Sequence, residues 1–248
     1  MARIKVIFSY DGTNFQGYQR QHNYRTVQGE IEKVLSRVFD EEIKFVASGR
    51  TDLKVHALYQ IAHFDAKRNE NLNRMCDVLN HLLPKDIHFK SMEYVDDNFH
   101  ARISAIRKTY RYIINMGEEN PFYQNYRYEL HRTLDIDLIK ECLNKFVGTK
   151  RFRNFTTKEE DYQDFVRTIY DLNLKEEGEL VTFEITGSGF MKHMVRMIVG
   201  TLVDIGLHKI PSSYIDEAFN TLKNPVNHLV PGSGLYLVNV EYEEGDSI

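Results

Sequence analysis

The chain has 248 residues and a formal net charge of −4, enough for one large or two medium domains with buried cores. Its 42 % hydrophobic and 27 % charged residues are typical of a soluble globular protein. No apolar run approaches the roughly 20 residues of a bilayer-spanning helix, and the N-terminal segment turns polar at Ser9, too early for a secretory signal. We therefore expect a cytoplasmic protein that does not associate with membranes.

The net charge and the cysteine content argue against several further classes of protein. The negative net charge argues against a protein that coats nucleic acid by bulk charge, but a local basic cleft is still compatible with it. Cys76 and Cys142 lie far apart in the chain, so neither a disulfide framework nor a cysteine zinc site is expected.

The first half of the chain alternates predicted strands and helices. Residues 3–10 are rich in β-branched and aromatic side chains and predict a strand. Residues 26–39 carry apolar residues on one helical face, with Thr26 as the N-cap. The loop between them, residues 11–25, is longer than most connections, and such loops are often functional. The next predicted elements are strand-like runs at 42–48 and 58–66, a helix at 71–83 and a strand at 86–95.

The second half repeats this order of elements without repeating the sequence. It predicts a strand within residues 105–117, a helix within 135–148, a hairpin at 167–189 that turns at Glu177-Gly178, helices at 190–206 and 212–224, and a last strand at 234–244. We therefore expect an α+β fold of two similar α/β domains with mostly antiparallel sheets, residues 1–104 and 105–248.

A polar segment between two strand-like runs contains Arg50, Thr51 and Asp52 side by side. In one interpretation Thr51 and Asp52 bond to backbone amides in a turn, and Arg50 neutralises the aspartate. In the other, the adjacent cation keeps Asp52 ionised for use as a base or nucleophile. The local pattern favours neither.

The predicted helix at 190–206 is apolar around most of its circumference, which indicates a core helix. The remaining strip carries His193, Arg196, Gly200 and Asp204 at spacings of three and four. An arginine on such a strip usually pairs with an acid or a helix end, and Asp52 is one candidate. Gly200 allows another backbone to approach closely.

The strand near residue 108 combines cations with aromatic side chains. Strand alternation puts Lys108, Tyr110 and Tyr112 on one face. With Arg102 nearby, this face either belongs to a solvated edge strand or holds phosphates and stacks bases. His56 and His63 have no third ligand at metal spacing, so hydrogen-bonded histidines are expected there and no metal.

Five blocks of the sequence resemble one known family. The segment SGRTDLKVHALYQIAHF, residues 48–64, is similar to the signature of the TruA family of tRNA pseudouridine synthases, in which GRTD precedes two small residues and VHA. The other matching blocks follow in the order of the family: YDGTNFQGYQRQ with TVQGEIEKVL, FHARISA with KTYRY, HMVRMIVGTL, and GLYLVNVEY.

This resemblance implies a fold, a reaction and a partner. The pseudouridine synthase fold has two domains with a positively charged cleft between them, and the family forms homodimers and uses no cofactor. Its enzymes isomerise uridine to pseudouridine at positions 38, 39 and 40 of the tRNA anticodon stem-loop.

The resemblance also assigns roles to residues. It makes Asp52 the catalytic aspartate, Tyr110 the active-site tyrosine and Arg196 the arginine that pairs with the aspartate. Arg50 helps to hold the flipped-out nucleotide. The remaining residues expected to bind RNA are Lys54, His56, Arg102 and Lys108.

Three positions depart from the family pattern. Lys54 stands where the family has glycine, after the bulky Leu53, so lysine costs about 1 kcal/mol or more if the site requires a positive φ, or else the loop differs in shape. Met197 replaces an asparagine and Tyr18 a tryptophan. The alternatives are therefore a divergent paralogue that modifies other tRNA or ribosomal RNA uridines, or a catalytically silent RNA-binding module. A metabolic enzyme unrelated to RNA is compatible with composition alone.

Overall fold

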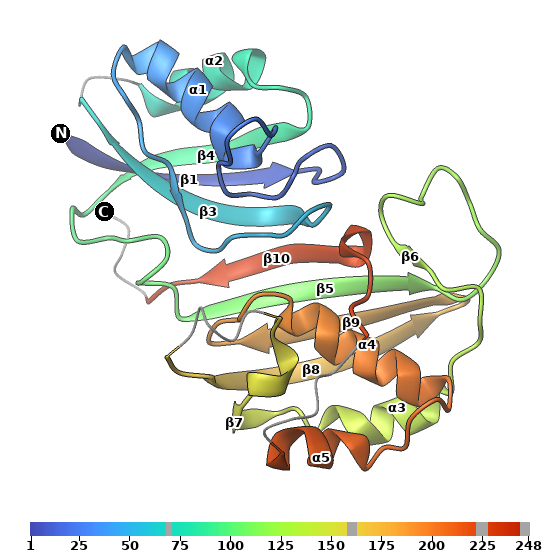
Figure 1. The fold of residues 1–248 in the computed structure, drawn as a ribbon. Coiled ribbons are helices and arrows are strands. Elements are labelled where there is room, and N and C mark those ends of the chain that lie inside the picture. Colours follow the sequence, from blue (N-terminus) through green and yellow to red (C-terminus); the bar gives the residue numbers. More distant parts are fainter. Residues whose placement is uncertain (68–70, 158–162, 222–227, 244–248) are drawn as a thin grey trace. The chain divides into compact units, whose positions relative to one another are not determined.

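The computed structural model describes residues 1–67, 71–157, 163–221 and 228–243. The chain divides into two compact units, residues 1–108 together with 236–248, and residues 109–235. Each unit combines a sheet with helices (Figure 1). The predicted domain boundary at residue 104 and the cleft between the domains stay predictions.

The sheet of the first unit is built on strand β1, Ala2–Tyr10. It pairs antiparallel with β3, His56–Ala66, on one side and with β4, Ile87–Val95, on the other. The chain returns to this unit at its end, where β10, Leu235–Glu241, pairs in parallel with β3 through Tyr236 and Leu237.

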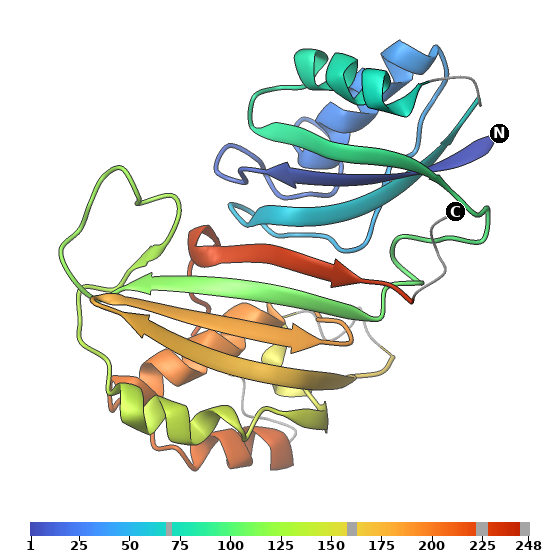
Figure 2. The ribbon, with the colours of Figure 1, turned by 180° about the vertical axis from the view of Figure 1, so that it is seen from behind.

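Two helices cover one face of this sheet (Figures 1 and 2). Helix α1, Val27–Phe39, begins after Thr26, whose side chain accepts a hydrogen bond from the Gly29 amide, as predicted. Helix α2 spans Leu72–Leu82. The core between helices and sheet is largely aromatic, and its fully buried rings include Phe8, Phe45, Phe64 and Phe89. Such rings each bury a large apolar area and account for much of the stability of a core.

The predicted strand at 42–48 is shorter in the structure, where only β2, Val46–Ala47, pairs with β3. The amides before it bond to side chains of α1 instead. Ile43 N donates to Ser36 Oγ at 2.9 Å, and Phe45 N donates to Glu32 Oε1 at 3.1 Å. These bonds satisfy the backbone without a neighbouring strand, so alternation of apolar residues was misleading here.

The second unit contains strands in the order β5-β9-β8-β7. The hairpin of β8, Val166–Glu177, and β9, Leu180–Gly187, is antiparallel and turns through Gly178, which confirms the predicted turn. Strand β7, Gly148–Arg151, lies at the far side of β8. Strand β5, Arg107–Asn115, begins in the last residues of the first unit, and the short β6, Tyr128–Glu129, pairs with it.

The helices of this unit are α3, Ile136–Leu143, α4, Met194–Gly206, and α5, Tyr214–Asn220, with short 3₁₀ turns at Arg153–Phe155 and Gly232–Gly234. Helix α4 crosses one face of β8 and β9 (Figures 1 and 2), and α3 packs against it. The predicted residues 222–224 of the helix after α4 and residue 244 of the last strand lie outside the described residues.

Helix α4 starts at Met194 and not at Phe190 as predicted. His193 has a φ of 64°, a left-handed conformation that cannot continue a right-handed helix. Thr156 Oγ1 donates to Lys192 O at 3.0 Å, and Thr157 Oγ1 lies 2.6 Å from His193 Nδ1. A local sequence pattern does not reveal these contacts with a distant segment.

Strands in both units are mostly antiparallel and the helices lie beside them, so the predicted α+β class is confirmed. Among the described residues, no helix is both long and apolar enough to cross a bilayer.

Candidate active site

Asp52 lies in the loop between β2 and β3, residues 48–55, here called the Asp52 loop, and hydrogen bonds fix the backbone on both sides of it. Thr51 O accepts from Tyr18 N at 3.0 Å, and Asp52 O accepts from Val55 N at 3.2 Å. The Thr51 side chain is buried and lies 2.7 Å from the Tyr10 hydroxyl. Asp52 itself is half-buried. A carboxylate on a loop held this firmly has little freedom to move, as a catalytic group requires.

The start of the same loop is fixed by Gln60 and Lys108. Ser48 Oγ donates to Gln60 Oε1 at 2.6 Å, and Gln60 Nε2 donates to Gly49 O at 3.0 Å. Lys108 Nζ donates to Ser48 O at 2.5 Å. Burial, together with the positive charge of Arg102, lowers the pKa of Lys108 to about 8.

The long loop at 11–25 packs against the Asp52 loop. Arg25 anchors it, because its guanidinium donates to both carboxylate oxygens of Asp86, at 2.7 and 2.9 Å, and stacks on Phe15. Gly12 lies against the end of the Asp52 loop: a Cβ on it would stand 2.1 Å from Val55 O. Only glycine permits this approach, so the long loop has a role in placing Asp52.

The tip of the Asp52 loop faces solvent. Arg50, Leu53 and Lys54 are exposed. Lys54 has a φ of 61°, so the first alternative of the sequence analysis holds: the position requires a positive φ, and lysine adopts it at a cost of about 1–2 kcal/mol.

Both histidines of the following strand are buried and hydrogen-bonded. His56 stacks on Tyr236, with ring centroids 4.7 Å apart, and its Nδ1 accepts from Gly12 N at 3.0 Å. His63 Nδ1 accepts from Ala101 N at 3.1 Å. Burial, aided by the charge of Arg3, lowers the pKa of His63 to about 4, so the ring is neutral at pH 7.

The bond to His63 also holds the turn that carries Arg102. Tyr242 donates from its hydroxyl to Ala101 O at 2.7 Å, and Arg3 donates to Phe99 O at 2.9 Å. Arg102 projects from this anchored turn and is exposed.

Tyr110 and Arg196 belong to the second unit. Tyr110 is buried on β5 and packs edge-on against Phe190, with ring centroids 5.2 Å apart. Arg196 lies on α4, and its Nε donates to Val230 O at 2.7 Å. The pairing of Arg196 with Asp52 stays a prediction.

The predicted strip of α4 lies against the segment before β10. A Cβ on Gly200 would stand 2.1 Å from His228 O, which confirms the close backbone approach expected at this glycine. Asp204 Oδ1 lies 3.0 Å from His228 Nδ1, and the Tyr112 hydroxyl donates to Pro231 O at 2.7 Å. The strip therefore positions residues 228–231.

The first unit thus contains six of the eight predicted site residues, and the second unit contains Tyr110 and Arg196. Sequence reasoning missed the residues that hold the Asp52 loop, namely Tyr10, Ser48 and Gln60. Gln60 is a polar residue inside the apolar strand at 58–66 and is fully buried. A buried polar side chain must find partners, and this was the available signal.

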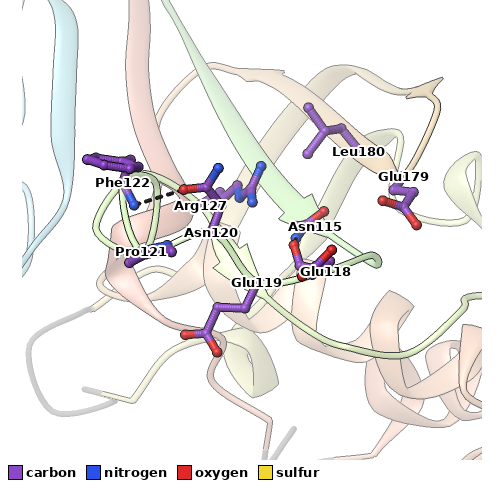
Figure 3. Close-up of a pocket in the computed structure, with 9 residues that line it drawn as sticks. All are labelled: Asn115, Glu118, Glu119, Asn120, Pro121, Phe122, Arg127, Glu179 and Leu180. Atoms are coloured by element: carbon purple, nitrogen blue, oxygen red, sulfur yellow. Dashed lines mark hydrogen bonds between the residues drawn. The ribbon is translucent and has the colours of Figure 1, made fainter.

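A pocket of about 520 Å³ lies elsewhere, at the end of β5 and in the segment after it (Figure 3). Its lining includes the carboxylates of Glu118, Glu119 and Glu179, and also Arg127 and Phe122. None of the predicted site residues lines it. In the described part of the chain, no three metal-binding side chains lie close enough to hold an ion.

The family comparison matches residues 6–103 and 143–243 to the model described as tRNA pseudouridine synthase. The chain belongs to this family, and the resemblance inferred from the five blocks is confirmed. The matched ranges include Asp52 and Arg196, whereas Lys108 and Tyr110 lie between them.

Curated relatives match along almost the whole chain. A protein of Exiguobacterium sp. named tRNA pseudouridine synthase A is 40 % identical over 99 % of this chain and all of its own length. The protein of that name from Bacillus subtilis is 41 % identical over 97 % of this chain and 99 % of its own. A solved chain from an archaeal box H/ACA ribonucleoprotein complex is 15 % identical, with a TM-score of 0.37; the match covers 82 % of this chain and 42 % of that one.

Proposed function

We propose that this protein isomerises uridine to pseudouridine in the anticodon stem-loop of tRNA, at positions 38, 39 and 40, as a cytoplasmic homodimer without a cofactor. The observation that carries the proposal is the Asp52 loop: it lies inside the part of the chain that matches the family, and it is held by bonds to Tyr18, Gln60 and Lys108.

The reaction breaks the N1–C1′ bond of uridine, turns the uracil and joins C5 to C1′. The target base lies in a stack, so it must leave the stack at a cost of a few kcal/mol. Asp52, as a carboxylate, either attacks C1′ or removes a sugar proton to give a glycal. Tyr110 stacks on the uracil and assists in removal of the C5 proton. Arg196 favours the ionised aspartate.

The cations of the first unit bind the RNA in this proposal. Arg50 and Lys54 are exposed on either side of Asp52, and Arg102 is exposed on its anchored turn. Arg50 fills the space that the extruded nucleotide leaves, and the others contact the backbone. His56 is buried, so its role is indirect: its Nδ1 accepts a hydrogen bond from Gly12 N and thereby holds the loop at 11–25.

The test is release of tritium from anticodon-arm transcripts that carry C5-tritiated uridine. Wild-type protein should release tritium, and Asp52→Asn should release none above background. Asp77→Asn is the matched control, because Asp77 is exposed on α2 and should keep full activity. Release by Asp52→Asn would contradict the assigned role. Binding without release by wild type would indicate a silent RNA-binding module.

One observation favours a second target. The Lys54 side chain stands at a positive φ directly after Asp52 and Leu53, so this protein presents a cation and an apolar group where the family has small residues. Mapping pseudouridine in cellular RNA with and without the gene distinguishes positions 38–40 from other tRNA or ribosomal uridines.

A further inference from the structure

Lys108 is a half-buried cation with few partners. Its Nζ donates to Ser48 O at 2.5 Å. Within the described part of the chain, this carbonyl is its one hydrogen-bond acceptor, and no carboxylate oxygen lies within 4.0 Å of Nζ. Because an ammonium carries three donors, two N–H groups have no protein acceptor there.

A second cation acts on Lys108. Burial lowers the pKa of Lys108, and the positive charge of Arg102 is close enough to lower it further. The guanidinium of Arg102 has no ion pair with any described carboxylate. Two cations that repel one another, one of them partly removed from solvent, raise the free energy of the protein alone.

Hydrogen bonds hold the backbone that carries Arg102 and the ammonium group of Lys108. Arg102 extends from the turn that is held by His63, Tyr242 and Arg3. Lys108 is fixed by the backbone at the start of the Asp52 loop, four residues before the aspartate. An anion that contacts both cations would therefore meet an ammonium already in place and a guanidinium on an anchored turn, which lowers the entropic cost of binding.

We propose that Lys108 and Arg102 form a subsite for one phosphodiester of the RNA substrate, next to the Asp52 loop. Lys108 joins the loop to that phosphate, since one of its N–H groups holds Ser48 O and the others face the anion. This inference rests on the proposed function and specifies which chemical group of the RNA these residues bind. A planar guanidinium and a compact ammonium are both common phosphate ligands.

The first experiment measures equilibrium binding of the unmodified anticodon arm, with every protein in an Asp52→Asn background to prevent turnover. Lys108→Met and Arg102→Gln should each bind roughly ten- to a hundredfold more weakly, as expected for the loss of a charge-assisted hydrogen bond. The slope of log Kd against log salt should fall by about 1 in each. Lys33→Met, an exposed lysine on α1, is the control and should change both values little.

Lys108→Met also removes the bond to Ser48 O, so a second readout excludes a purely structural effect. Affinity of the Asp52→Asn protein should fall about tenfold from pH 7 to pH 9, because a shrinking fraction of Lys108 is protonated. Lys108→Arg should bind well and lose this pH dependence. Single neutral methylphosphonates in the RNA should identify one phosphate whose replacement weakens the Asp52→Asn protein but not Lys108→Met.

Two results would overturn the subsite: equal losses in Lys108→Met and Lys33→Met, or methylphosphonates that act equally on both proteins. Failure of the proposed function has a different signature, which is absence of tritium release from the wild type whatever the binding data show.

Discussion

Arg196 and Val230 are joined by a hydrogen bond from the guanidinium Nε to the main-chain carbonyl, 2.7 Å long. The next carbonyl, of Pro231, accepts from the Tyr112 hydroxyl. The Nε of the Arg196 guanidinium is thus bound to the backbone before β10, and this bond fixes the direction of the side chain. An arginine with one nitrogen anchored in this way presents the rest of its fork in a defined geometry.

Arg196→Met should destabilise the protein by about 1–3 kcal/mol, because the carbonyl of Val230 loses its donor in a partly buried place. Urea unfolding at pH 7 measures the change. Lys140→Met, at an exposed position on α3, should change the free energy of unfolding by less than about 0.5 kcal/mol. If the two variants unfold at the same urea concentration, the bond contributes nothing to stability.

Lys54→Gly should raise the free energy of unfolding by about 1 kcal/mol, because glycine adopts the φ of 61° without steric cost. Lys54→Ala is the matched variant: it removes the same charge but keeps the Cβ that causes the strain. Thermal unfolding of both variants against wild type measures the difference. An alanine variant as stable as the glycine variant would show that the backbone of the Asp52 loop is relaxed.

Tyr18→Phe should stabilise the protein by about 1 kcal/mol or more. The Tyr18 hydroxyl is buried without a hydrogen-bond partner among the described residues, and burial raises its pKa well above the usual 10.0. Phenylalanine has no hydroxyl to bury, so the variant avoids the free-energy cost of desolvating an unsatisfied polar group.

Tyr10→Phe is the natural comparison for Tyr18→Phe. The Tyr10 hydroxyl lies 2.7 Å from Thr51 Oγ1, so its removal should destabilise the protein by about 1 kcal/mol. Chemical denaturation of both variants measures whether each change raises or lowers the free energy of unfolding. A destabilised Tyr18→Phe would mean that this hydroxyl has a partner in solution.

His63 should make the protein less stable in acid. Its pKa is about 4 in the folded protein against an ordinary 6.5, so between these values the unfolded chain binds more protons. The contribution of the neutral ring is complete above pH 6.5 and is lost as pH falls toward 4, by roughly 2.5 kcal/mol at pH 4.5. Urea unfolding across this range measures the slope.

His63→Asn, which keeps an acceptor for the Ala101 amide but does not titrate, should flatten this slope. His88→Asn, at an exposed position on β4, should leave it as in the wild type. A slope that persists in His63→Asn would assign the acid sensitivity to another group.

Much of the local structure follows from the sequence alone. The N-cap Thr26, the turn at Gly178 and the role of Gly200 each depend on residues within a few positions of one another, or on the missing side chain of a single glycine. The five family blocks also lie in single continuous stretches. These features are readable because their physical causes are local.

The tertiary structure decided which distant groups satisfy one another. Side chains of α1 take the amides of residues 43 and 45 and shorten a predicted strand, and a left-handed His193, held by Thr157, delays the start of α4. The bond from Lys108 to Ser48 spans 60 positions. Periodicity shows which side chains are buried, but the partners of buried polar groups depend on chain segments that meet only after folding, because every such group must be satisfied by whatever donor or acceptor lies beside it.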